Sequence, residues 1–191
     1  MAVNAAQENT ALRLWLLLPR VGDALAVCQD LLFSKYGLTT EQWRVLMAIK
    51  ARGPLRPVDI ASLLERGPNT ISQLVDRMVK AGLVRRTRDK KDRRAVFVSM
   101  TDKGKEAIEP AFPAGWELFH KLLSPLSYDD QCALADMLET LKCELAGYLN
   151  PELDKTEITK SSLTRDPDLY KRLVKNVLSP GRGGKRKRSE K

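Results

Sequence analysis

The sequence of 191 residues is poor in cysteine and histidine, and it has no long hydrophobic run. Three cysteines form neither a disulfide framework nor a CxxC pair, and one histidine leaves a zinc site short of ligands. The apolar run from Leu14 to Leu18 is five residues long, whereas a membrane-spanning helix needs about 20. Pro19, Arg20 and Asp23 interrupt the region where a secretory signal would be apolar. We therefore expect a cytoplasmic protein with free thiols, no metal or cofactor, and no membrane contact.

What the sequence has in excess is positive charge, with 33 Lys and Arg against 24 Asp and Glu. Residues 85–94 hold seven basic and two acidic side chains, and residues 180–191 hold six basic and one acidic. The other 20 basic and 21 acidic residues nearly cancel. Such clusters bind nucleic acid or anionic surfaces because Lys and Arg displace counterions from phosphates. The alternative is a merely solvated loop and tail.

Apolar residues at helical spacing predict one long helix over about 5–33, with a kink or a fresh start at Pro19. A helix that begins at Thr39 or Thr40 follows it, and then a short helix that ends at Gly67. These three helices precede the most informative segment of the chain.

The next helix begins at Pro68 and separates apolar from polar residues. Its core face is expected to hold Ile71, Leu74, Val75, Met78 and Val79. Its other side carries amides, hydroxyls and charged groups, with Asn69, Gln73, Asp76 and Lys80 opposite the core and Thr70, Ser72 and Arg77 on the flanks. These residue types read base edges and contact phosphates in a major groove. The alternative is an ordinary solvated face.

After this helix the hydrophobic period changes to two. Residues 95–100 read as a strand with residues 84–87 as its partner, so the basic run lies at the tip of a hairpin. A short helix, a polar-faced helix and a basic hairpin in succession form a winged helix-turn-helix. The sequence thus predicts a DNA-binding module whose wing is this hairpin.

Two long helical segments follow the hairpin. The first, over about 101–123, is expected to be bent by Pro110 and Pro113, and the second is capped by Ser127. The second helix has an apolar stripe at Leu134, Met137, Leu138, Leu141, Leu145 and Tyr148. Long helices at both ends cannot all bury their apolar faces on a small central module. We therefore expect a two-fold homodimer with two DNA-reading heads.

The predicted fold class is mainly α with a small β-hairpin wing, a winged helix-turn-helix with long N- and C-terminal dimerisation helices. We divide the chain into an N-terminal dimerisation helix, a DNA-binding domain, C-terminal dimerisation helices and a polar, basic, flexible tail, at 1–37, 38–101, 102–150 and 151–191. The tail has one amphipathic segment around 168–178. It either adds non-specific DNA affinity, binds another partner, or does neither.

Residues 38–104, LTTEQWRVLMAIKARGPLRPVDIASLLERGPNTISQLVDRMVKAGLVRRTRDKKDRRAVFVSMTDKG, resemble the MarR family of transcriptional regulators. The most specific parts are LTTEQW, TISQLVDRMVKAGLVRR and DRRAVFVSMTDKG, and the likeness covers residues 10–149. The resemblance implies a homodimer with interlocked terminal helices that binds double-stranded DNA at a pseudo-palindromic operator. Members of the family usually repress transcription, and some are released by a small ligand.

The resemblance also implies roles for residues on the polar helix. Ser72 and Gln73 match positions that face the major groove, and Thr70 matches a neighbour near the start of the helix. Asn69 lies on the same polar face, whereas Arg77 and Lys80 are expected at the DNA backbone. Arg77 has a structural role as its alternative.

In the wing, Asp92 and Arg94 match a DxR pattern. The resemblance implies that Arg94 reaches into the minor groove while Asp92 holds the wing. An arginine in a narrow minor groove senses enhanced negative potential, and a nearby carboxylate restricts its rotamers. Phosphate contacts are then expected from Lys90, Lys91 and Arg93.

Family members often bind small aromatic acids between the dimer helices and the reading head. The candidates for such a cleft by location are Trp15, Tyr36, Trp43, Trp116 and His120, with core packing as the alternative for each. The cysteine by which some members sense oxidants is absent, because Leu17 and Leu18 occupy that region. Whether Cys28, Cys132 or Cys143 senses redox stays open. For Cys132 and Cys143 the alternatives are pairing across subunits and interface or surface thiols.

No enzyme is expected. The sequence has no GxxxxGK[ST], GxSxG, GxGxxG or HExxH motif, and one histidine gives little scope for acid-base chemistry. The alternative to a sequence-specific regulator is an architectural DNA-binding protein with weak sequence preference. Ser72 and Gln73 have few strong bidentate options, which favours that alternative.

Overall fold

The computed structural model describes residues 5–88 and 95–149. Six helices and two strands follow one another as α1 (Ala5–Ser34), α2 (Thr40–Arg52), α3 (Pro57–Leu64), α4 (Pro68–Lys80), β1 (Val84–Arg88), β2 (Val96–Met100), α5 (Asp102–Leu123) and α6 (Tyr128–Leu149). The two strands form one antiparallel hairpin, so the predicted mainly α fold class is confirmed. The wing tip at 89–94 and the segment around 168–178 lie outside the described residues.

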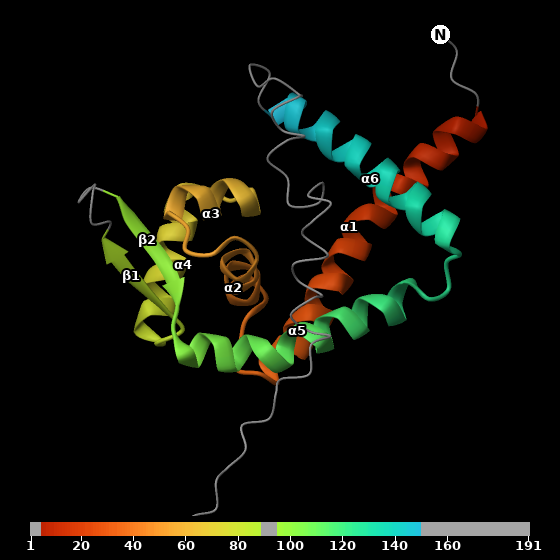
Figure 1. The fold of residues 1–191 in the computed structure, drawn as a ribbon. Coiled ribbons are helices and arrows are strands. Elements are labelled where there is room, and N and C mark those ends of the chain that lie inside the picture. The colour runs from red at the N-terminus through yellow and green to blue at the C-terminus, as the bar shows by residue number, and fades with distance from the viewer. Residues whose placement is uncertain (1–4, 89–94, 150–191) are drawn as a thin grey trace, which may run out of the picture.

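The chain divides into a body and long helices (Figure 1). We call α2, α3, α4, β1 and β2 the reading head, and α1 and α6 the arm helices. In the view of Figure 1, α5 runs along one side of the reading head and continues toward the arm helices. The last turn of α1 and the first half of α5 also contribute to the core of the head, through Phe33 and Ile108.

The largest fully buried side chains all lie in or against the reading head: Phe33, Val45, Leu46, Ile60, Ile71, Val75, Met78, Val84, Val98 and Ile108. The core face predicted for α4 is confirmed at its four buried positions, Ile71, Leu74, Val75 and Met78. The prediction is wrong at Val79, which is 38% exposed because it lies at the edge of the apolar stripe.

The ends of the head helices follow local capping chemistry. Thr39 caps α2, since its hydroxyl accepts the amide of Gln42 and its own amide donates to the Gln42 side chain. The expected end of α3 at Gly67 is wrong, because the helix ends at Leu64 and Glu65 adopts a left-handed conformation with φ 53°. The Arg66 amide then donates to the Ala61 carbonyl and closes the last turn. Gly67 instead precedes α4 as its N-cap.

Prolines do not divide the long helices. Pro19 lies inside a continuous α1, so a fresh start there is wrong, and Pro110 and Pro113 lie inside α5. A proline removes one backbone hydrogen bond, while the turns on either side keep theirs and carry the helix through.

The hairpin is tied to the head at its base. Val84 pairs with Met100 and Arg88 with Val96, so the strands are in register up to the wing tip. Leu55 adds a bridge to Val98, with reciprocal N···O distances of 3.1 and 2.7 Å. These hydrogen bonds attach the base of the wing to the core of the reading head.

The arm helices leave most of their apolar side chains exposed. No residue of α6 is buried, and every member of its predicted stripe is exposed. Large exposed side chains on α1 include Leu12, Trp15, Leu18, Val21 and Leu31. Exposed apolar side chains in this number are typical of helices that pack against another surface. No helix of the described residues combines the length and the apolar character needed to cross a membrane.

Candidate nucleic-acid interface

Helix α4 presents its polar residues on the surface of the head. Proline at the first helical position needs no hydrogen-bond partner for its nitrogen, which suits the start at Pro68. The predicted DNA-facing side chains then follow: Asn69, Thr70, Gln73, Arg77 and Lys80 are exposed, and Ser72 is half-buried. Because the opposite face of α4 is buried in the core, the helix presents this polar face to solvent in a fixed direction.

The C-terminal end of α4 is held by the beginning of α5. The Thr101 hydroxyl lies 3.1 Å from the Leu83 carbonyl oxygen, and the Thr101 amide donates to the same carbonyl. Lys103 Nζ donates to the Ala81 carbonyl at 2.8 Å, where the last carbonyls of α4 need partners. Gly104 allows this approach, because an added Cβ would lie 2.1 Å from the Leu83 oxygen. The TDKG motif, residues 101–104, therefore holds the C-terminal end of α4 against the start of α5.

An ion pair connects α4 to the wing. Arg86 Nη1 on β1 lies 2.9 Å from Asp76 Oδ1 on the polar face of α4. Arg86 thus neutralises the negative charge that Asp76 would otherwise place on the polar face of α4. On the same strand, Arg85 Nε lies 3.3 Å from Ser99 Oγ across the hairpin. The Arg86–Asp76 pair therefore connects the wing base to the polar helix, and the Arg85–Ser99 contact joins the two strands of the hairpin.

All five predicted wing residues fall outside the described residues: Lys90, Lys91, Asp92, Arg93 and Arg94. Their roles at DNA stay predictions. The strand that leads to them places three arginines, Arg85, Arg86 and Arg88, on the exposed part of β1. The approach to the wing tip is thus basic on the described side as well.

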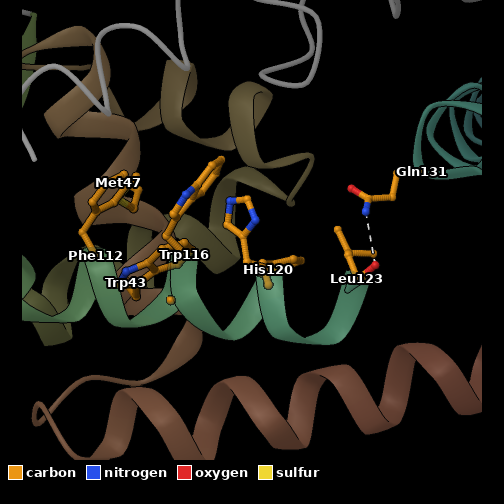
Figure 2. Close-up of a pocket in the computed structure, with 9 residues that line it drawn as sticks. Trp43, Met47, Phe112, Trp116, His120, Leu123 and Gln131 are labelled. Atoms are coloured by element: carbon orange, nitrogen blue, oxygen red, sulfur yellow. Dashed lines mark hydrogen bonds between the residues drawn. The ribbon is translucent and has the colours of Figure 1, made fainter. Parts of the chain in front are cut away.

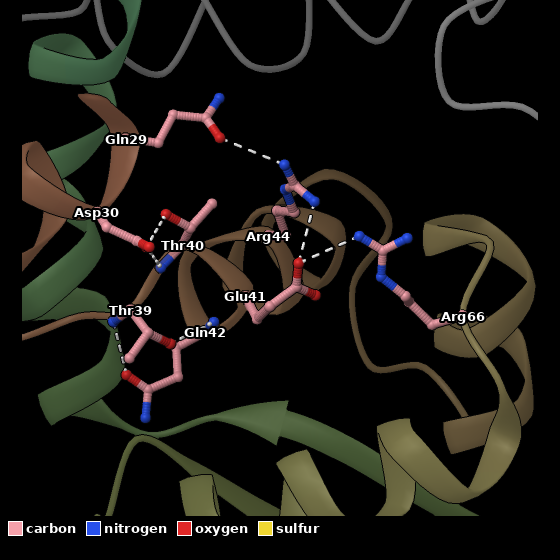
Figure 3. A network of polar contacts seen from close by, with 8 residues as sticks. All are labelled: Gln29, Asp30, Thr39, Thr40, Glu41, Gln42, Arg44 and Arg66. Atoms are coloured by element: carbon pink, nitrogen blue, oxygen red, sulfur yellow. Dashed lines mark hydrogen bonds and ion pairs between the residues drawn. The ribbon is translucent and has the colours of Figure 1, made fainter. Parts of the chain in front are cut away.

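A polar network connects α1 to the turn that precedes α4 (Figure 3). The Glu41 carboxylate lies between Arg44, at 3.0 Å, and Arg66, at 3.3 Å. Arg44 Nη2 also donates to the buried Gln29 side chain on α1, at 3.3 Å. The network extends from an arm helix through α2 to the residue before Gly67.

A second polar pair fixes the start of α3. The Arg56 guanidinium donates to both carboxylate oxygens of Asp59, at 2.9 and 2.8 Å. This hydrogen-bonded partner lowers the pKa of Asp59 below its ordinary value, and the same carboxylate raises the pKa of Arg56. The carboxylate also accepts the Arg56 backbone amide and so caps the helix.

A cavity of about 390 Å³ lies where the head meets α5 and the start of α6. Figure 2 shows its lining from three elements, with Trp43 and Met47 from α2, Phe112, Trp116 and His120 from α5, and Gln131 from α6. Three of the five predicted cleft residues therefore come together. Trp15 and Tyr36 do not line this cavity, because Trp15 is 77% exposed on α1 and Tyr36 packs against the head core.

Sequence reasoning missed the contacts that orient the interface. Asp76 and Arg86 are ten residues apart on a helix and a strand, and no periodicity relates them. Glu41 and Arg66 are brought together only by the fold. The local signal for one of these contacts was the TDKG motif at residues 101–104. A Thr before a helix indicates an N-cap, and a Gly three residues later indicates that another backbone segment approaches the helix closely.

The fold and this surface define a winged helix-turn-helix DNA-binding protein. A MarR-family model matches residues 36–95. The HTH-type transcriptional repressor MdtR of Bacillus subtilis (strain 168) is 30% identical over 107 residues, which cover 56% of this chain and 69% of MdtR. The HTH-type transcriptional regulator PecS of Dickeya dadantii (strain 3937) is 30% identical over 133 residues, which cover 68% and 80%. The chain belongs to the MarR family and is a DNA-binding transcriptional regulator.

A solved relative carries the same fold on DNA. A cysteine-to-serine mutant of MarR from E. coli, complexed with operator DNA, is 25% identical with a TM-score of 0.64, covering 70% of this chain and 96% of that one. The named relatives are transcriptional regulators, so the expectation that the chain is no enzyme is confirmed.

Proposed function

We propose that the chain is a homodimeric repressor that binds a pseudo-palindromic operator and is released by a small ligand. The observation that carries the proposal is the contrast between a rigid polar α4 and the uncovered apolar faces of α1 and α6. A second copy seated on those faces buries them and brings two reading heads onto one side of a DNA duplex. The relative MdtR, named a transcriptional repressor, supports the sign of regulation.

On DNA, α4 lies in the major groove with Ser72 and Gln73 toward base edges and Asn69 and Thr70 beside them. Arg77 and Lys80 contact the backbone. These side chains are solvent-accessible on one face, which supports their assignment. Arg94 at the wing tip enters the minor groove, supported by Asp92, and the DxR resemblance carries this part of the proposal.

Four functional segments follow from the proposal. Residues 1–37 and 102–150 form the dimer, residues 38–101 read DNA, and residues 151–191 are a basic tail. The shared core at Phe33 and Ile108 supports mechanical coupling between the first three. The cavity between α2, α5 and α6 is the site at which a ligand acts on that coupling.

The experiment is fluorescence anisotropy with the full chain at about 0.15 M salt, on DNA from upstream of its own gene and on random fragments. Specific regulation predicts at least about 10³-fold preference for one upstream site. Equal, steeply salt-dependent affinity for every fragment would contradict it and favour an architectural DNA-binding protein.

Two variants separate base reading from backbone contact in the same assay. Arg94→Ala should weaken operator binding at least about tenfold, or 1.4 kcal/mol. Gln73→Ala should relax preference at one position per half-site by roughly 1–3 kcal/mol. A uniform loss on all sequences for Gln73→Ala would reassign Gln73 to the backbone, and an unchanged Kd for Arg94→Ala would remove the minor-groove role.

A further inference from the structure

The turn between α3 and α4 has an unusual backbone conformation. Among the described residues that are not glycine, Glu65 alone has a positive φ, of 53°. A left-handed conformation is uncommon for a residue with a Cβ, and it persists where the surrounding structure holds it. The polar helix α4 begins at Pro68, three residues further on. The contacts of Glu65 and of its neighbour Arg66 therefore influence where α4 begins.

The Glu65 side chain contacts the arm helix α6. Lys142 Nζ lies 2.5 Å from Glu65 Oε1, and the two side chains are 31% and 50% exposed. In the view of Figure 1, α3 lies on the side of the head away from α5. No residue of α6 is buried, so this charged contact is not part of an apolar interface within the described chain. The pair connects the head to α6 on the side away from α5.

Arg66 is connected to the other arm helix through two side chains of α2. Arg66 Nη2 and Arg44 Nη1 lie 3.3 and 3.0 Å from the same oxygen, Glu41 Oε1. Arg44 Nη2 donates to Gln29 Oε1 at 3.3 Å, and Gln29 is buried on α1 (Figure 3). Two consecutive residues of the turn are thus connected to the two arm helices, directly to α6 and through α2 to α1.

The exposure of the Glu65–Lys142 pair indicates what it contributes. A partly exposed ion pair stabilises a fold only modestly, and the core of the head is already buried without it. Complementary charges on two facing elements fix their register more than they add affinity. The pair is therefore suited to hold the head at one orientation on the arm helices.

We propose that Glu65 and Lys142 are positioning residues that set the orientation of the reading head on the arm helices, and so the half-site spacing that the dimer accepts. The inference rests on the proposed homodimeric regulator and names a determinant of its specificity. Half-sites of a dimeric helix-turn-helix protein lie about one helical turn apart, or a multiple of it. One added base pair moves a half-site by about 3.4 Å and rotates it by about 35°. A head connected to both arm helices resists that change.

The test measures the spacing tolerance of the full chain by fluorescence anisotropy. The probes are the upstream fragment with the highest affinity and two copies of it, with one base pair inserted or removed between the half-sites. The parent chain should prefer the original spacing. Glu65→Gln should reduce that preference by at least about threefold, the size expected when each subunit loses one partly exposed ion pair. A general change in DNA affinity from the lost negative charge cancels in the ratio.

An exchange of charges separates the ion pair from other effects of the substitutions. Lys142→Gln should give the same loss as Glu65→Gln, and the two together no more than either alone, because both remove one contact. Glu65→Lys combined with Lys142→Glu should restore the preference. Glu106→Gln, which removes an exposed carboxylate on α5, should leave it unchanged. The same spacing preference in the parent chain and in both single variants would overturn the proposal.

Hydrogen exchange of the free chain is a second readout that needs no DNA. Protection of residues 62–70 should decrease in Glu65→Gln and return in the variant with exchanged charges. Unchanged protection would show that the pair does not hold the turn and would also overturn the proposal.

Failure of this inference is distinguishable from failure of the proposed function. If no upstream fragment is preferred over random DNA, the proposed function fails and the inference with it. If one fragment is preferred and its spacing preference is the same in the parent chain, Glu65→Gln and Lys142→Gln, only the inference fails.

Discussion

The reading head buries its apolar side chains, whereas the arm helices leave most of theirs exposed. In the head, side chains such as Leu46, Ile60 and Val98 are fully buried within one chain. On the arms, Leu141 and Leu145 of α6 and Val21 of α1 remain exposed. The head therefore has a complete core in a single chain, whereas the apolar faces of the arms are uncovered among the described residues and would be buried by the second copy of the proposed dimer. Substitutions of one kind should have different consequences in the two regions.

The largest difference is expected from adding one methyl group to a glycine in each region. Gly104→Ala would place Cβ 2.1 Å from the Leu83 carbonyl oxygen, so backbone must shift and the head should lose about 3 kcal/mol of unfolding free energy. The matched variant Gly22→Ala in α1 meets nothing within 4 Å and should gain up to about 1 kcal/mol. Chemical denaturation of both variants measures the contrast. Equal stabilities would show that the close approach at α5 is not what holds α4.

The second largest effect is expected on the dissociation constant of the proposed dimer, while the reading head stays folded. Leu141→Glu puts a charge in the exposed stripe of α6, and the proposed dimer should weaken at least about a hundredfold, or 2.7 kcal/mol. Cys132→Glu adds the same charge on the exposed side opposite that stripe and is the control. Sedimentation velocity gives the dimer constant, and circular dichroism checks the helices. A monomeric parent chain, or a Leu141→Glu dimer of unchanged affinity, would contradict the role of α6.

Features that depend on local spacing could be predicted from the sequence, whereas contacts between distant elements could not. Periodicity along one helix identified the buried face of α4 and the exposed stripe of α6, because both depend on local spacing. The expected helix end at Gly67 and the alternative of a fresh start at Pro19 were wrong, because α3 ends at Leu64 and α1 continues through the proline. Contacts between distant elements, such as Asp76 with Arg86, depend on tertiary packing that no local pattern encodes.

The lining of the cavity also could be predicted only in part, because it depends on tertiary packing. The aromatic residues Trp43, Trp116 and His120 were predicted together because they flank the region between head and arms. The sequence could not show that the described lining has no basic residue, since that depends on where every neighbouring side chain points. It also placed Trp15 and Tyr36 in the group, although one lies on an arm surface and the other against the core.

A smaller effect tests the connection between the two regions. Glu41→Gln removes the charge shared by Arg44 and Arg66, and the unfolding free energy should fall by roughly 0.5 kcal/mol because these groups are partly exposed. Hydrogen exchange should increase most around residues 62–70, which precede and begin α4. Glu106→Gln, an exposed carboxylate on α5, is the control. Unchanged exchange around residues 62–70 would show that the network does not restrain the turn.

The smallest effect concerns pH and the cap of α3. The Arg56 guanidinium lowers the pKa of Asp59 below the ordinary value of 3.8, so the ionised carboxylate is favoured in the folded state. Its stabilisation is therefore complete above pH 3.8 and is lost as the pH falls through the lowered value in the folded state. Asp59→Asn should lower the Tm slightly at pH 7, and the difference from the parent chain should shrink below pH 3.8. Thermal unfolding across that range measures it. A difference that stays constant to low pH would assign the effect to helix capping by either side chain and not to the charge of Asp59.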